Sequence, residues 1–211
     1  MRTDDLINAL SQDAPVRWRF TRALALAAGG GALVAAALFF TLMGPRPDFM
    51  EAIETVRFLF KFVVTLILAA TALGLAMRLA QPGVSAGRWR WAPILAPALL
   101  ILAVIAELAV MPSQTWGERL VGTHVRFCLT LIPFLAIGPL ALLLLALRQG
   151  APTRPGLAGA VAGLAASGIA ATFYAANCTD DSPLFVATWY PIAVGFVTLA
   201  GYLAGKRLLS W

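Results

Sequence analysis

The sequence predicts an all-α fold, a bundle of six transmembrane helices built from three helical hairpins, with the N- and C-termini in the cytoplasm. Of the 211 residues, 60% are hydrophobic and only 12% are charged, whereas an average soluble domain has about a quarter charged residues. The apolar residues gather in stretches of about 20 residues, the length at which a helix crosses a bilayer. None of these stretches alternates apolar and polar residues as a barrel strand would.

Six such stretches occur along the chain. The first is uncharged, and its length does not fit a cleaved signal peptide. The fifth and sixth each contain two glycines four residues apart, a spacing that lets helix backbones pack closely. Together the stretches form a membrane domain, residues 23–207, which follows a cytoplasmic segment, residues 1–22. The expected spans are, in chain order, about 23–43, 58–77, 93–111, 127–147, 156–176 and 186–205.

The basic residues are distributed unevenly between the two sides of the expected membrane. Eleven of the 16 Lys and Arg residues flank the side that holds both termini. Because cytoplasmic loops carry an excess of Lys and Arg, this side is predicted to be cytoplasmic. The net charge of +6 therefore indicates orientation in lipid, and no direct contact with nucleic acid is predicted.

The loops on the opposite, outer side contain a weak internal repeat. Each has an early proline, an aromatic residue and a glutamate, followed by Val-Arg-Phe where the chain returns to the membrane, at 56–58 and 125–127. This pattern indicates two related helical hairpins, with the last two spans as a third. The alternative is coincidence between short loops.

Two charged residues lie inside the expected spans. Lys61 and Glu107 are each about one helical turn from the outer end of their span. A lone charge in lipid is costly, so the matching depths predict an ion pair between them. The alternative is that Lys61 extends to the membrane surface while Glu107 is protonated or hydrogen-bonded.

The two cysteines are predicted to lie on the outer side, where disulfides persist. Cys128 begins the fourth span, and Cys178 lies in the loop between the fifth and sixth spans. His124 precedes Cys128 by four residues, so these two with Cys178 and either Asp180 or Asp181 would form a tetrahedral site for a divalent metal. Three interpretations stay open: a disulfide, a metal site on Cys128, Cys178 and His124, and two separate thiols.

Catalysis is not predicted. A thiol oxidoreductase of the membrane needs Cys-x-x-Cys or two cysteine pairs, and this chain has two cysteines. The sequence also contains no nucleophile elbow, His-Glu-x-x-His motif or phosphate-binding loop. No cofactor is predicted apart from the metal of the second interpretation above.

The N-terminal segment has the pattern of a short amphipathic helix that ends before Pro15. A helix of this length is marginal alone and needs a surface to bind. Because its charges are acidic rather than basic, a protein partner is favoured over lipid; the alternative is the chain's own loops. The residues expected to make the contact are Thr3, Asp4, Asp5, Leu6, Ile7 and Leu10.

Three features together resemble the NrsF family: Thr-Asp-Asp-Leu-Ile at 3–7, the six spans, and Cys-Thr-Asp-Asp-Ser-Pro at 178–183. NrsF proteins are integral-membrane anti-sigma factors, negative regulators of the extracytoplasmic-function sigma factor sigma-F in proteobacteria. The resemblance implies a sigma factor as partner and a location in the bacterial inner membrane. It also implies that Cys128 and Cys178 respond to metal or oxidative stress.

The leading interpretation is a membrane-embedded anti-sigma factor. It would hold a sigma factor through residues 1–22, with help from the short 88–91 loop, and release it when the outer-face cysteines sense oxidant or heavy metal. The competing interpretations are a small proton- or ion-coupled transporter that uses Glu107 and Lys61, and a structural subunit of a larger membrane complex.

Overall fold

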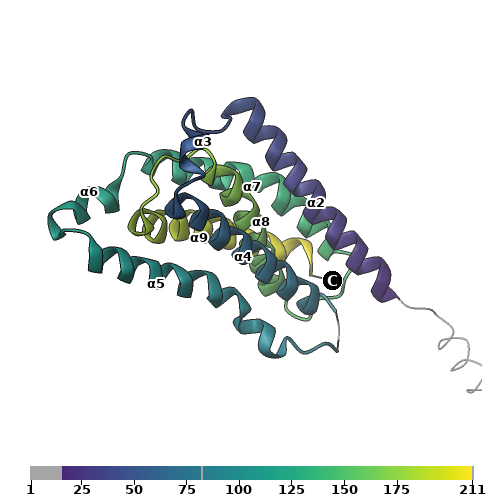
Figure 1. Cartoon of the computed structure of the whole chain (residues 1–211). Coiled ribbons are helices and arrows are strands. Elements are labelled where there is room, and N and C mark those ends of the chain that lie inside the picture. Colours follow the sequence, from purple (N-terminus) through teal and green to yellow (C-terminus); the bar gives the residue numbers. More distant parts are fainter. Residues whose placement is uncertain (1–15, 82, 211) are drawn as a thin grey trace, which may run out of the picture.

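The structure is a computed structural model that describes residues 16–81 and 83–210. The regular elements in these residues are all helices (Figure 1). The long helices are α2 (Val16–Leu42), α4 (Val56–Leu79), α5 (Leu95–Val110), α7 (Val125–Leu147), α8 (Pro155–Ala175) and α9 (Pro183–Leu208). The short helices are α3 (Phe49–Ala52), η1 (Gly87–Ile94), η2 (Ser113–Thr115) and α6 (Trp116–Val121).

Six helices are long and apolar enough to cross a membrane, as the sequence predicts. Their ends extend beyond several of the predicted limits: α2 begins at Val16 instead of 23, and α9 continues to Leu208. The third is a composite, because η1 contains Pro93 and the regular α-helix begins only at Leu95.

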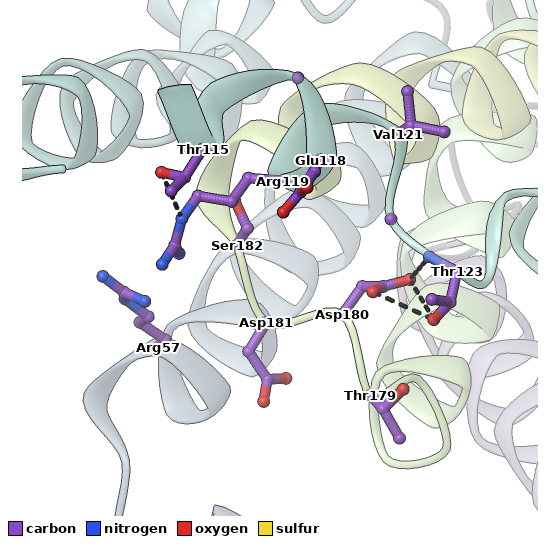
Figure 2. Close-up of a pocket in the computed structure, with 12 residues that line it drawn as sticks. Arg57, Thr115, Glu118, Arg119, Val121, Thr123, Thr179, Asp180, Asp181 and Ser182 are labelled. Atoms are coloured by element: carbon purple, nitrogen blue, oxygen red, sulfur yellow. Dashed lines mark hydrogen bonds between the residues drawn. The ribbon is translucent and has the colours of Figure 1, made fainter. Parts of the chain in front are cut away.

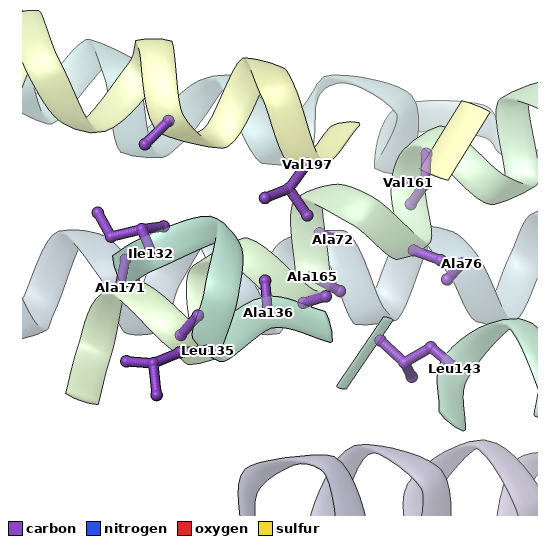
Figure 3. Packing of buried hydrophobic residues seen from close by; sticks show 14 of the residues in the cluster. Ala72, Ala76, Ile132, Leu135, Ala136, Leu143, Val161, Ala165, Ala171 and Val197 are labelled. Atoms are coloured by element: carbon purple, nitrogen blue, oxygen red, sulfur yellow. The ribbon is translucent and has the colours of Figure 1, made fainter. Parts of the chain in front are cut away.

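Helix α8 is the centre of the bundle. It contacts α2, α4, α7 and α9, and 67% of its most apolar stretch is buried. Its side chains are mostly those of alanine and glycine, so larger residues of its neighbours fill the space around it, as with Ile132 and Leu135 of α7 and Val197 of α9 (Figure 3). Small residues allow this close approach where no hydrophobic drive operates between helices in lipid.

The α8–α9 pair is the tightest contact, as the glycine pattern predicts. A Cβ atom at Gly163 would lie 2.7 Å from the carbonyl oxygen of Val197, and one at Gly205 would lie 2.6 Å from that of Pro155. A Cβ at Gly159 would collide with the backbone of Gly201. The expected close packing of the last two spans is confirmed.

Helices α2 and α5 lie at the periphery of the bundle (Figure 1). Helix α2 packs mainly along α7, which is not its neighbour in the sequence. Helix α5 contacts α4, α9 and η1, and only 17% of the most apolar stretch of this third span is buried. Apart from the α8–α9 pair, the arrangement in three hairpins stays a prediction.

Three connections meet at one end of the bundle, which we call the Asp180 end: residues 43–55, 111–124 and 176–182. The backbone N–H of Arg46 donates to the Ala176 carbonyl (3.0 Å), and the Asn177 side chain donates to that of Gly44 (2.9 Å). The connections 80–86 and 148–154 meet at the opposite end, where the Ala151 N–H donates to the Ala80 carbonyl (3.3 Å).

Candidate functional site

The 177–182 loop is the centre of the candidate site. It joins α8 to α9 and carries Cys178, Asp180 and Asp181, three of the residues selected from the sequence. Lys61 and Arg46 bind Cys178 and Asp181, and the turn before α7 binds Asp180. The loop therefore links most of the helices at this end to one another.

Asp181 is bound by two cations that come from other elements. Lys61 of α4 forms an ion pair with it (2.5 Å), and Arg46, between α2 and α3, forms a second (2.8 Å). Lys61 is only 1% exposed. Its ammonium group also donates to the Cys178 carbonyl (2.8 Å). A buried charge needs this number of partners, because desolvation otherwise outweighs a single attraction.

Arg46 extends this network to the surface. Its guanidinium forms two hydrogen bonds with the Asp48 carboxylate (2.7 and 2.6 Å). These bonds hold the pKa of Asp48 below its usual value and raise the pKa of Arg46 further. We call Arg46, Asp48, Lys61 and Asp181 the Asp181 cluster.

Glu107 binds the start of α9 instead of Lys61. The buried carboxylate accepts hydrogen bonds from the Ser182 hydroxyl (2.8 and 3.0 Å) and from the Leu184 backbone N–H (3.0 Å). Arg119 of α6 adds an ion pair (3.2 Å). A carboxylate at this position is also stabilised by the partial positive charge of a helix N-terminus.

The predicted ion pair between Lys61 and Glu107 is therefore wrong. The prediction assumed that two charges at equal depth must pair with each other. In the structure the 177–182 loop and the start of α9 lie at the same level of the bundle and supply other partners for both charges. Lys61 binds Asp181, and Glu107 binds Arg119 and Ser182.

Asp180 holds the turn that precedes α7. Its carboxylate accepts the backbone N–H group of Thr123 (2.9 Å; Figure 2) and that of His124 (2.8 Å). Gly122 allows this approach: its φ is +59°, and a Cβ atom there would lie 2.7 Å from the Asp180 carboxylate. The loop therefore fixes the position at which α7 begins.

Both cysteines are free thiols in this structure, and both are fully buried. Burial raises the pKa of Cys178, although the positive charge of Lys61 opposes the effect. The thiol also lies 3.8 Å from the Asp180 carbonyl, to which it donates. A protonated, buried thiol reacts slowly, since the thiolate is the reactive form.

The expected tetrahedral metal site is not assembled. Among residues 16–81 and 83–210, no group of three or more His, Cys, Asp and Glu side chains is placed to hold a metal ion. His124 is the N-cap residue of α7, and its carbonyl accepts the Cys128 backbone N–H (2.8 Å), but its ring is held by other groups. The ring instead contacts the Thr123 hydroxyl (2.8 Å), that of Thr179 (3.2 Å) and the Asp180 carboxylate (3.5 Å).

Other expected contacts fall elsewhere. Thr3, Asp4, Asp5, Leu6, Ile7 and Leu10 lie outside the described residues. The 88–91 loop forms part of η1 at the end opposite the Asp180 end. There Trp89 packs against Gly74 of α4 under the Arg78 guanidinium (5.3 Å), while Trp91 is 60% exposed.

Sequence reasoning missed several members of the site. Arg46 and Arg119 were counted only among the basic residues that predict the orientation. Ser182 and Thr123 were not selected as site residues. One usable signal was charge balance. The consecutive acids Asp180 and Asp181 need buried partners, and few basic residues are expected on the same side of the membrane.

Comparison with known proteins identifies the family. The family model of NrsF, the negative regulator of sigma F, matches residues 10–211. The chain belongs to the NrsF family. Two relatives match it over the full length of both chains: the anti-sigma-F factor NrsF of Caulobacter vibrioides, with 37% identity, and a probable anti-sigma-F factor NrsF of Azospira oryzae, with 32%. No solved structure matches the chain. Membership of this family supports a regulatory role for the chain.

Proposed function

We propose that the chain is a membrane-embedded anti-sigma factor that sequesters an extracytoplasmic-function sigma factor and releases it when Cys128 and Cys178 meet oxidant or heavy metal. The observation that carries the proposal is the full-length match to two proteins named as anti-sigma-F factors. The six apolar helices support a multi-pass location, which we assign to the bacterial inner membrane.

The orientation follows from the distribution of charge. Residues 1–22 and the connections opposite the Asp180 end hold most of the Lys and Arg, which favours the cytoplasm for that end. The Asp180 end then faces the cell envelope, where thiols meet external oxidants and metals. The sigma factor would bind residues 1–22 on the cytoplasmic side, with Trp91 and its neighbours as additional contacts.

The position of Cys178 suggests how a thiol would act on the rest of the protein. Its side chain is buried, and its carbonyl accepts a hydrogen bond from Lys61 of α4. A metal or an added oxygen atom does not fit a well-packed interior without displacing its neighbours. The displaced loop would change its contacts with α4, through Lys61, and with α7, through Asp180.

Such a displacement changes the start of α9 as well, because Ser182 precedes that helix and binds Glu107. Helix α9 runs from the Asp180 end to the opposite end of the bundle (Figure 1). The stimulus and the sigma factor would thus favour different arrangements of the same bundle, which is the thermodynamic requirement for coupling.

Binding by the N-terminal segment can be tested by deletion of residues 2–14. We expect the truncated protein to reach the membrane fraction as well as the intact protein does, because all six spans remain. Its detergent extract should no longer co-purify a sigma factor, as the extract of the intact protein does. Undiminished co-purification would exclude the segment as the binding site.

The transporter interpretation receives no comparable support. Lys61 and Glu107, the groups it would use, bind the 177–182 loop and the start of α9. Both contacts attach a helix, α4 or α5, to the connection between α8 and α9 at one end of the bundle.

A further inference from the structure

A cleft of about 800 Å³ opens at the Asp180 end, beside the candidate site. Its walls come from the first turn of α4, from α6 with the turn on either side of it, and from residues 179–182 (Figure 2). We call it the Arg57 cleft, after the residue that α4 contributes. Neither the family assignment nor the proposed role of the thiols gives it a function.

The carboxylates of the loop that lines the cleft already have partners. Asp180 accepts two backbone N–H groups at the start of α7, and Asp181 is neutralised by Arg46 and Lys61. Figure 2 shows the Asp180 side chain directed toward Thr123. Asp181 is thus paired with two cations, and the Asp180 carboxylate keeps its charge but is turned toward Thr123 and away from Arg57 and Arg119 (Figure 2).

The basic residues of the cleft are different. Within the part of the chain that the structure describes, the Arg57 guanidinium has no ion pair and no hydrogen bond. Arg119 uses Nη1 for Glu107 and Nε for Thr115 and retains free N–H groups. In Figure 2 the two guanidinium groups face each other across one part of the cleft.

Two guanidinium groups directed at the same space repel each other, and an anion bound between them would offset this repulsion. Arginine is suited to this task, because its planar donors match the oxygens of a phosphate or carboxylate group. We infer that the Arg57 cleft binds a phosphate-type oxyanion between Arg57 and Arg119. The inference is independent of sigma-factor binding.

The position of Arg57 indicates two sources for such an anion. Arg57 is the second residue of α4, and its neighbour Val56 is 82% exposed on an apolar helix. This places Arg57 where the apolar span meets the loops, the level of lipid headgroups. The oxyanion is therefore either the phosphate of a membrane lipid or a soluble phosphate-type ion from the envelope.

The chain offers a matched control. Arg126 is the second residue of α7, in the same Val-Arg-Phe sequence as Arg57, but it does not line the cleft. Arg57→Gln and Arg126→Gln remove the same charge from equivalent positions of two helices. Because Arg57 has no protein partner in the described residues, its substitution should leave the fold intact, which circular dichroism and gel filtration check.

The first arm measures inorganic phosphate. The full-length protein in detergent is titrated by calorimetry at constant ionic strength, with chloride as the reference anion. We expect binding that Arg57→Gln weakens at least about tenfold, and that Arg126→Gln leaves unchanged. Glu118, the remaining carboxylate of the cleft, should oppose an anion, so Glu118→Gln should tighten binding.

The second arm measures lipid. Delipidated protein is mixed with phosphatidic acid or with the matching diacylglycerol, which lacks the phosphate, and bound lipid is counted by native mass spectrometry. Retention of phosphatidic acid alone, lost in Arg57→Gln and kept in Arg126→Gln, would identify a lipid headgroup as the source. Phosphate binding in the first arm that depends on Arg57, without retention of phosphatidic acid in the second, would identify a soluble ion.

Either result supports the inference. If neither phosphate nor phosphatidic acid binds, or if Arg126→Gln weakens binding as much as Arg57→Gln does, the inference is overturned.

Discussion

At the residue scale, the side chain that most needs explanation is Lys61. It is almost completely buried in a mostly apolar helix, and it binds both the Asp181 carboxylate and the Cys178 carbonyl. One cation thus holds the loop at two points, one of them the backbone of the proposed sensor. The charge also opposes the effect of burial on the pKa of the Cys178 thiol.

Replacement of Lys61 with Met tests this interaction. The change leaves Asp181 with Arg46 alone and leaves the Cys178 carbonyl without its main donor. We expect a loss of about 3 kcal/mol in the free energy of unfolding, the usual cost of removing one partner of a buried pair. Thermal unfolding of the purified protein in detergent measures it.

Lys206→Met is the control, since Lys206 is exposed at the far end of α9 and contacts the Tyr202 ring. Its melting temperature should stay close to that of the unchanged protein. Equal shifts in the two variants would mean that the Lys61 contacts contribute nothing specific.

At the element scale, the structure depends on the contact between α8 and α9. These helices touch through backbone atoms, because glycine occupies the facing positions. Van der Waals contact of this kind is the main attraction between helices in lipid. The pair also carries the loop with Cys178 at its turn, so a rigid pair would transmit a displacement of the loop along its length.

Gly159→Ala should therefore destabilise the protein. The added methyl group would meet the backbone of Gly201 and Gly205, which cannot rotate away. Overpacking of this kind costs typically about 1–3 kcal/mol. Gly195→Ala in α9 is the control, because a Cβ atom there meets no other atom within 4 Å. A lower melting temperature for Gly195→Ala than for Gly159→Ala would contradict this account of the packing.

Comparison of the elements with the sequence explains what could be predicted. The six spans and the close α8–α9 contact follow from local properties, hydropathy and glycine spacing, so the sequence contains them. The partner of Lys61 does not follow, because it depends on how deep the 177–182 loop lies in the folded bundle. The metal site with His124 does not follow either, because the ring of this N-cap residue contacts Thr123, Thr179 and Asp180, and the position of the 177–182 loop is not a local property of the sequence.

At the scale of the whole molecule, thiols that sense the envelope can control a cytoplasmic sigma factor only if the two ends of the bundle face different compartments. Ser113 is exposed at the Asp180 end, and Ser85 is exposed at the opposite end. Each can be replaced by Cys in a chain whose two native cysteines are Ser. A membrane-impermeant maleimide should label Cys introduced for Ser113 in intact cells, and Cys introduced for Ser85 only after the inner membrane is opened. The reverse pattern would invert the proposed orientation.

The central claim is that the chain holds a sigma factor and releases it through its thiols. The most direct measurement is the amount of sigma factor that stays bound to the purified, reconstituted protein before and after a thiol oxidant is added. We predict that the unchanged protein binds the sigma factor and releases most of it after oxidation, while the protein with Cys128→Ser and Cys178→Ser retains it. Absence of binding to the unchanged protein, or equal release from both proteins, would contradict the account.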